Sequence, residues 1–125
     1  MSDCACLWGS ADSDDQPAFY TRKWRTARKF HECCECRRTI VKGTQYEYFS
    51  GRWDGDFNVY RTCVACQDIR SSLYCDAWMF NQLWEDVTEQ IFRGTGLTIA
   101  CVDKLATVEG KAYLQQRWME YVEKP

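Results

Sequence analysis

The stretches that decide the fold are residues 33–36, CCEC, and residues 63–66, CVAC. Each contains two cysteines separated by two residues, and such a pair can chelate a metal ion from a single tight turn. Two pairs supply the four thiolates of a tetrahedral zinc site. We therefore predict a zinc ion held by Cys33, Cys36, Cys63 and Cys66. The competing interpretation, four reduced core cysteines, accounts less well for the paired spacing.

The sequence between the two cysteine pairs predicts a β-hairpin. β-Branched and aromatic residues dominate residues 39–49 and 57–62, with a turn at Trp53, Asp54 and Gly55. Residues from Cys63 to about Tyr74 then suit a helix, whose first turn favours anionic thiolates. A knuckle, a hairpin and a helix carrying the last two ligands make up the treble-clef zinc arrangement. We therefore expect an α+β fold built on a small treble-clef core.

Helices are expected on both sides of this core. Apolar residues recur at helical spacing from Pro17 to about Phe30, which predicts a short amphipathic helix. Further along, Asp76 can begin a helix that ends near Gly94, and Thr107 can cap a last one. The expected organisation is an N-terminal arm with Cys4 and Cys6 (1–16), a zinc core (17–75) and a C-terminal helical cap (76–125), forming one compact domain.

The remaining cysteines suggest a second metal site. The chain has 125 residues and nine cysteines, an odd number that argues against a closed disulfide set. No basic stretch followed by an apolar one opens the chain, so a reducing cytoplasm is expected. His31 could replace one ligand, although packing is its more ordinary role, and Cys101 lies in an apolar stretch typical of a core residue. The cysteines expected to hold a second zinc are Cys4, Cys6, Cys34 and Cys75.

Catalysis is not expected. The single histidine excludes sites that need two imidazoles. A zinc ion bound by four cysteines has no open position for a substrate or an activated water. We therefore expect a non-enzymatic protein that acts by binding.

Basic residues form a band between two acidic parts of the chain. Residues 21–42 carry eight basic and two acidic side chains, a local charge of +6, although the whole chain has a net charge of −2. Arg37 and Arg38 follow the knuckle and are expected to donate to thiolate sulfurs. The other cations are expected on the predicted N-terminal helix, as a solvated face or as contacts to phosphates: Arg22, Lys23, Arg25, Arg28 and Lys29.

The sequence resembles a group of small cysteine-rich proteins of phages and prophages. The similarity rests on residues 27–38, Gly43, residues 51–55 (GRWDG), residues 62–66 and residues 75–78 (CDAW). It includes Cys4 and Cys6, covers most of the chain and is looser from about residue 95. The resemblance implies a phage accessory protein in the bacterial host cytoplasm and implies no particular chemistry.

Two classes of partner follow from these observations. The first is a host protein or complex, such as a defence system inhibited in the manner of anti-CRISPR proteins. Aromatic residues make up 15% of the chain and dominate interface hot spots. Trp53 is the best exposed candidate, whereas Trp78, Trp84 and Trp118 suit the core. The alternative is a nucleic acid, bound in transcription or DNA metabolism through the basic face of residues 22–38.

Overall fold

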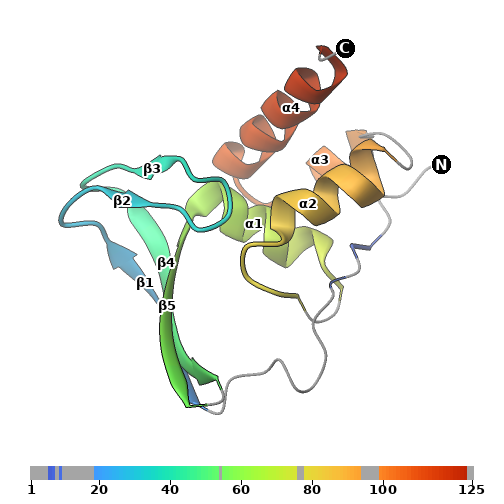
Figure 1. Cartoon of the computed structure of the whole chain (residues 1–125). Coiled ribbons are helices and arrows are strands. Elements are labelled where there is room, and N and C mark those ends of the chain that lie inside the picture. The colour runs from blue at the N-terminus through green and yellow to red at the C-terminus, as the bar shows by residue number, and fades with distance from the viewer. Residues whose placement is uncertain are drawn as a thin grey trace.

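The computed structural model describes residues 6–7, 9, 19–53, 55–75, 78–93 and 99–123. It is a mixed α+β structure in which the strands lie on one side and the helices on the other (Figure 1). The strands are β1 (Phe19–Thr26), β2 (His31–Glu32), β3 (Thr39–Ile40), β4 (Gln45–Trp53) and β5 (Asp56–Cys63). The helices are α1 (Val64–Leu73), α2 (Leu83–Val87), the π-helical turn η2 (Thr88–Phe92), α3 (Ile99–Asp103) and α4 (Val108–Glu123).

The predicted hairpin is present as β4 and β5, but its first strand begins at Gln45 and not at Thr39, because Thr39–Ile40 pairs with β2 in the other sheet. They pair antiparallel from Tyr46 opposite Cys63 to Trp53 opposite Asp56. Gly55 in the connecting turn has φ +87°, a backbone conformation that glycine adopts without steric cost. Cys63, the last residue of β5, directly precedes α1, as the sequence predicted.

The predicted helix over residues 17–30 is wrong, because residues 19–26 form strand β1. This strand pairs antiparallel with β4, from Phe19 opposite Arg52 to Thr26 opposite Gln45, which gives a three-stranded sheet in the order β1-β4-β5. The segment is rich in aromatic residues and threonine, which favour strands. A short apolar pattern fits either period, and a neighbouring strand edge satisfies the backbone groups that a short isolated helix satisfies poorly.

A second, two-stranded sheet carries the first cysteine pair. β2 pairs with β3 through His31 opposite Ile40 and Glu32 opposite Thr39. The tight turn between these strands contains Cys33 and Cys36, and the Cys33 backbone N–H donates to the Arg38 carbonyl at 2.9 Å. This turn faces the beginning of α1, so the two cysteine pairs meet there.

Helix α1 is the central element, with Ile69 and Leu73 fully buried beneath the other helices. The buried carboxylate of Asp68 joins α1 to α4 by accepting from the Thr107 hydroxyl at 2.6 Å and the Thr107 backbone N–H at 2.8 Å. Thr107 in turn accepts from the Gly110 backbone N–H at 2.9 Å, which confirms it as the cap of the last helix. A Cβ at Gly110 would lie 2.3 Å from an Asp68 oxygen, so the close approach of the helices depends on glycine.

The segment expected to form a helix from Asp76 to Gly94 is helical over only part of its length. Asp76 and Gly94 lie outside the described residues, and α2 begins at Leu83 after Asn81, whose φ is +70°. Across the described part of the chain, no helix is both long enough and apolar enough to cross a membrane.

Candidate metal centre

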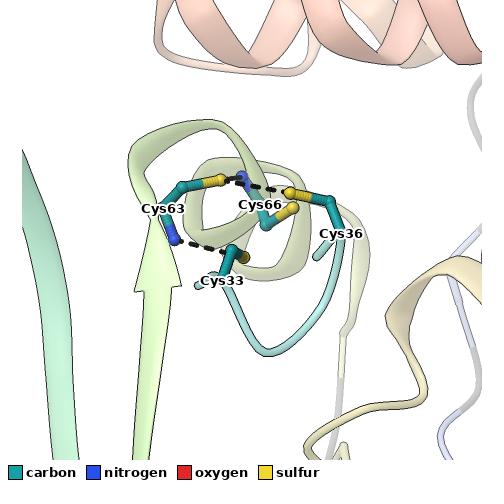
Figure 2. A group of neighbouring side chains, drawn as sticks. All are labelled: Cys33, Cys36, Cys63 and Cys66. Carbon is teal, nitrogen blue, oxygen red and sulfur yellow. Dashed lines mark hydrogen bonds between the residues drawn. The ribbon is translucent and has the colours of Figure 1, made fainter. Parts of the chain in front are cut away.

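The four predicted zinc ligands converge at one end of α1 (Figure 2). Cys33 and Cys36 come from the turn between β2 and β3, Cys63 ends β5, and Cys66 lies in the first turn of α1. Their ligand atoms all lie within 4.8 Å of one another. Cys33 and Cys66 are fully buried, and the other two are partly buried. Four cysteines therefore lie together in a group that could hold a metal ion.

The spacing of the sulfur atoms suits zinc. A zinc ion with four Zn–S bonds of about 2.3 Å at tetrahedral angles sets neighbouring sulfurs about 3.8 Å apart. The Sγ atoms of Cys36 and Cys63 are 3.8 Å apart. Thiolates in a closed group of four are the ligand set of structural zinc, so the site is compatible with that ion.

Each of the four sulfurs accepts a hydrogen bond from a nitrogen. The Cys63 backbone N–H donates to Cys33 Sγ at 3.4 Å, and the Cys66 backbone N–H donates to Cys63 Sγ at 3.5 Å. The Arg38 Nε donates to Cys36 Sγ at 3.4 Å. The Trp84 Nε1 donates to Cys66 Sγ at 3.3 Å. Donors that point at sulfur stabilise negative thiolates and orient them toward a cation.

Hydrogen bonds among the sulfurs divide their pKa values into two groups. The bond to Cys33 is the main cause that lowers the pKa of Cys36 far below its usual range, and it also lowers the pKa of Cys63 to about 7. The reciprocal bonds, together with burial, raise the pKa of Cys33 and of Cys66. Zinc binds thiolates, so the protons that remain on these thiols must leave when a cation binds.

Of the two side chains that donate hydrogen bonds to the sulfurs, the sequence predicted this role for Arg38 but not for Trp84. Arg38 makes the predicted thiolate contact, and its guanidinium also lies 3.4 Å above the centre of the Tyr113 ring of α4. Trp84 was expected only to pack, and no sequence signal shows which acceptor an indole N–H will meet. Arg37 does not contact a sulfur: it pairs with Glu32 at 3.1 Å, and its φ of +66° turns the chain out of the knuckle.

The cysteines predicted for a second zinc are not brought together among the described residues. Cys6 and Cys75 form a disulfide with Cα atoms 5.5 Å apart, and Leu7 donates its backbone N–H to the Leu73 carbonyl at 2.9 Å. Cys34 lies near the other end of α1, with its sulfur 3.4 Å from the Thr62 hydroxyl. The ten residues of α1 span about 15 Å, too far for one metal ion to bridge. Cys4 lies outside the described residues.

Cys101, Cys34 and His31 all lie outside the group of four cysteines. Cys101 is buried, as the apolar stretch predicted, but it is a disulfide cysteine and not a free thiol. Burial is the main cause that raises the pKa of Cys34 to about 12, so its thiol stays protonated at neutral pH. His31 is absent from the cysteine group, and its ring packs against Tyr46 with centroids 5.3 Å apart. Burial, and then the cations Arg61 and Lys29, lower the pKa of His31.

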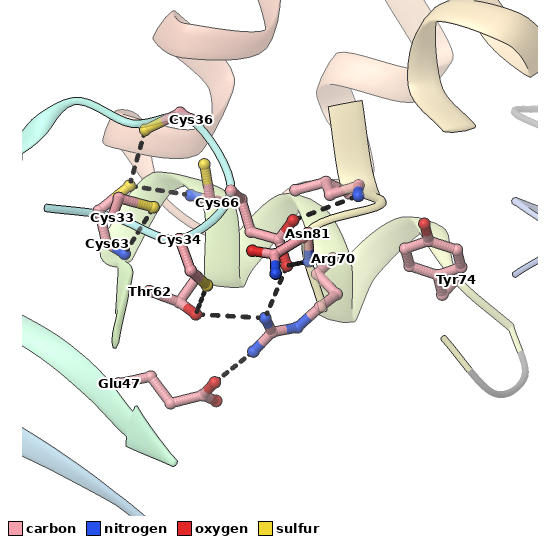
Figure 3. Close-up of polar contacts among 12 residues, drawn as sticks. Cys33, Cys34, Cys36, Glu47, Thr62, Cys63, Cys66, Arg70, Tyr74 and Asn81 are labelled. Carbon is pink, nitrogen blue, oxygen red and sulfur yellow. Dashed lines mark hydrogen bonds and ion pairs between the residues drawn. The ribbon is translucent and has the colours of Figure 1, made fainter. Parts of the chain in front are cut away.

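A buried cluster of charges fixes the knuckle to the rest of the molecule (Figure 3). Arg70 of α1, 1% exposed, bonds to Glu47 of β4, lies 3.6 Å from Glu35 and donates to the Thr62 hydroxyl at 3.3 Å. The oxygens of Glu35 accept from the backbone N–H groups of Asn81 and Leu83, both at 3.2 Å. Burial raises the pKa of Glu35, while Arg70 and these two amides oppose that shift. Glu35, which directly precedes the proposed ligand Cys36, thereby positions the start of α2. The spacing of the cysteines could not indicate this role.

The predicted basic face is divided by the strand that replaced the helix. Arg22 points toward Glu47 and forms an ion pair with it at 2.8 Å. Arg25, Arg28 and Lys29 are exposed. Trp53 ends β4, and its side chain lies outside the described part. Trp84 is buried, while Trp78 and Trp118 are partly buried against the core, as the packing interpretation predicted.

Comparisons with known proteins give no match. No protein-family model, no curated protein and no solved structure is significantly similar to this chain.

Proposed function

We propose that Cys33, Cys36, Cys63 and Cys66 hold one structural zinc ion in a treble-clef arrangement. The support is the arrangement of two ligands in the turn between β2 and β3, the β4–β5 hairpin, and two ligands at the start of α1. A nitrogen donor at every sulfur adds to it. In this proposal the ion joins the two sheets to α1 and supplies folding free energy.

The proposed site is non-enzymatic. Four thiolates complete a tetrahedron, so no coordination position is left for a substrate or for a water of lowered pKa. Hydrogen bonds to the sulfurs reduce the electron density available for nucleophilic attack. The function is therefore assigned to a surface of the folded protein and not to the metal.

We propose that this surface binds nucleic acid, as an accessory protein would in transcription or DNA metabolism. The single observation that carries the proposal is that the basic side chains of β1 lie on two opposite faces of the sheet. Arg22 faces the interior side of the sheet and is neutralised by Glu47, whereas Lys23 points to the opposite, open side. Unneutralised cations on an open face are what phosphate binding requires.

A host protein or complex is the second candidate, including inhibition of a defence system. Its support is a groove of about 390 Å³ between β3 and α4, whose walls include Ile40, Val41, Ala112 and Tyr113. The tryptophans that first suggested this partner lend less support, because Trp84 and its neighbours pack inside the protein. We therefore rank it below nucleic acid.

A salt titration with generic DNA tests the proposal. We expect binding at 50 mM salt that weakens steeply toward 200 mM, and that is lost in the double variant Lys23→Glu/Arg25→Glu. The matched control is Lys104→Glu, an exposed lysine that follows α3 on the helical side of the molecule. If the folded, metal-loaded protein does not bind DNA at 50 mM salt, the nucleic-acid proposal is wrong and the host-protein candidate takes its place.

A further inference from the structure

The side of the sheet opposite the Arg22–Glu47 ion pair carries cations and aromatic rings, and Lys23, Arg52 and Phe57 are exposed on it. Residues directly opposite one another in neighbouring strands share a face, so the register defines this outer sheet face. One row across it is Lys23, Tyr48 and Arg61; another, at the far end, is Arg52 and Phe57. The row between them has only short side chains: Thr21, Ser50 and Val59.

The cations of the outer sheet face have no strand carboxylate beside them. The described strands β1, β4 and β5 contain two acidic residues, Glu47 and Asp56, and alternation directs both to the other face. Among the described residues, no carboxylate lies within ion-pair distance of Lys23, Arg25, Arg52 or Arg61, since the ion pairs found involve other residues. Charges beyond about 10 Å are screened at 0.1 M salt, so the acidic residues elsewhere in the chain do little to cancel this local field.

Rings and guanidinium groups on this face are stacked and not paired with acceptors. The Arg25 guanidinium lies 3.7 Å above the centre of the Tyr48 ring, and that of Arg61 lies 5.8 Å from the same ring. The Nε of Arg61 is buried and has no hydrogen-bond partner among the described residues. Phe57 is 62% exposed at the other end of the face. Two stacking positions are thus separated by four residues of strand, about 13 Å.

We propose, on the basis of the nucleic-acid function above, that the outer sheet face binds single-stranded nucleic acid. Its bases stack on the Tyr48–Arg25 pair and on Phe57, and its phosphates lie against Lys23, Arg52 and Arg61. Every base has a π-face that stacks on an aromatic ring or a guanidinium plane, so this contact requires unpaired bases but no particular sequence. The short side chains of the middle row leave room for the strand to cross.

A duplex fits this face less well. The major groove of B-form DNA admits a helix or a two-stranded ribbon, whereas this face spans three strands, whose outer backbones alone are about 10 Å apart. Paired bases also keep their faces stacked on one another, so the half-buried ring of Tyr48 and the exposed ring of Phe57 would gain no stacking from a duplex. A protein partner would have to bring several carboxylates to four cations that stand in rows rather than around one pocket.

Fluorescence anisotropy with the metal-loaded full chain tests this inference. The probes are a labelled 12-residue oligothymidine and a labelled 12-base-pair duplex, each titrated between 50 and 200 mM salt. We expect tighter binding to the single strand. The three phosphate contacts of Lys23, Arg52 and Arg61 give a slope of about −2.1 in the double-logarithmic salt plot, and therefore a loss of roughly 20-fold over this range. Arg52→Gln is expected to reduce that loss to roughly 7-fold, and Lys104→Gln to leave it unchanged.

The aromatic contact has its own test. Tyr48→Ala is expected to weaken binding of the single strand by roughly 5- to 100-fold, while Tyr48→Phe keeps the ring and retains binding. Circular dichroism shows whether the Tyr48→Ala variant is folded, and exposed Phe57→Ala is a second ring variant that should not disturb the fold. Phe57→Ala is expected to weaken binding in the same direction.

Each result that contradicts the inference has a separate meaning. Equal affinity for the duplex and the single strand overturns the inference and leaves the nucleic-acid function standing. Preference for the single strand that survives Tyr48→Ala, Phe57→Ala and Arg52→Gln overturns the choice of this face. Absence of binding to both probes at 50 mM salt overturns the inference and the proposed function together.

Discussion

Replacing Cys36 by serine is expected to remove the metal and unfold the chain, whereas Cys34→Ser is expected to do neither. The two cysteines lie in the same turn and differ in what their sulfurs contact. Cys36 Sγ lies 3.8 Å from Cys63 Sγ and accepts from Arg38, whereas Cys34 Sγ lies 3.4 Å from the Thr62 hydroxyl. The same chemical change at two positions of one turn, separated only by Glu35, therefore distinguishes a proposed metal ligand from a cysteine that is not one.

The magnitude follows from comparing two free energies. A structural zinc site contributes about 10–16 kcal/mol of apparent binding free energy near neutral pH. A chain of 125 residues has a total stability of about 6–19 kcal/mol at 0.05–0.15 kcal/mol per residue. Loss of a ligand at Cys36 therefore removes most or all of the stability. Cys34→Ser alters one weak contact to a hydroxyl and costs about 1 kcal/mol.

Elemental analysis and thermal unfolding followed by circular dichroism check the expectation. The unmodified chain and Cys34→Ser should each contain one zinc ion per chain and should melt cooperatively. Cys36→Ser should be metal-free and unfolded, or should not accumulate. A metal-free Cys36→Ser variant that melts like the unmodified chain would refute the assignment of zinc as the source of stability. Two zinc ions per chain, one of them lost in Cys34→Ser, would restore the second site that the disulfide excludes.

Three further predictions concern contacts that hold α1 to the rest of the fold. Arg70→Met leaves buried Glu35 without its cation and leaves Glu47 with only the half-exposed Arg22, so it should cost about 3–5 kcal/mol in urea unfolding. Arg93→Met, which breaks an exposed pair with Glu89, should cost less than about 0.5 kcal/mol. Equal costs would show that burial of the cluster does not matter. Asp68→Ala should cost about 3 kcal/mol, because it leaves the N–H groups of Ala106 and Thr107 without their acceptor. Burial opposes ionisation of Asp68, but hydrogen bonds from Thr107 outweigh it and lower its pKa, so this contribution should be complete above the unfolded-state pKa of about 4 and lost as the pH falls through the lower folded-state value. A difference between the two proteins that stays constant from pH 7 to pH 2 would contradict that assignment. Cys75→Ser opens a loop of 69 residues and should cost about 4 kcal/mol without reductant, and a difference that persists undiminished in excess reductant would mean that the disulfide is not its cause.

The group of four cysteines and the elements that carry it could be predicted from the sequence because their information is local. Two cysteines three positions apart form a chelate whatever the rest of the chain does, and a turn between two runs of β-branched and aromatic residues predicts a hairpin. Thr107 as a helix cap is local in the same sense, since its acceptor role involves the N–H of a residue three positions later. The structure brings the four cysteines together, and it confirms the hairpin and the Thr107 cap.

The contacts that the sequence left open join residues far apart in the chain. The segment from Tyr20 to Thr26 fits a strand or a helix by period alone. Pairing with the edge of β4, between 19 and 31 residues away along the chain, decided for the strand. That choice separated Arg22 from Lys23 and so created the open cationic face, because a strand directs neighbouring side chains to opposite sides. The Cys6–Cys75 disulfide and the hydrogen bond from Trp84 to Cys66 also join distant residues, and they form only because the packing around α1 places these side chains next to one another. Spacing along the chain thus determined which atoms could bind a metal, and tertiary packing determined which surface was left for a partner.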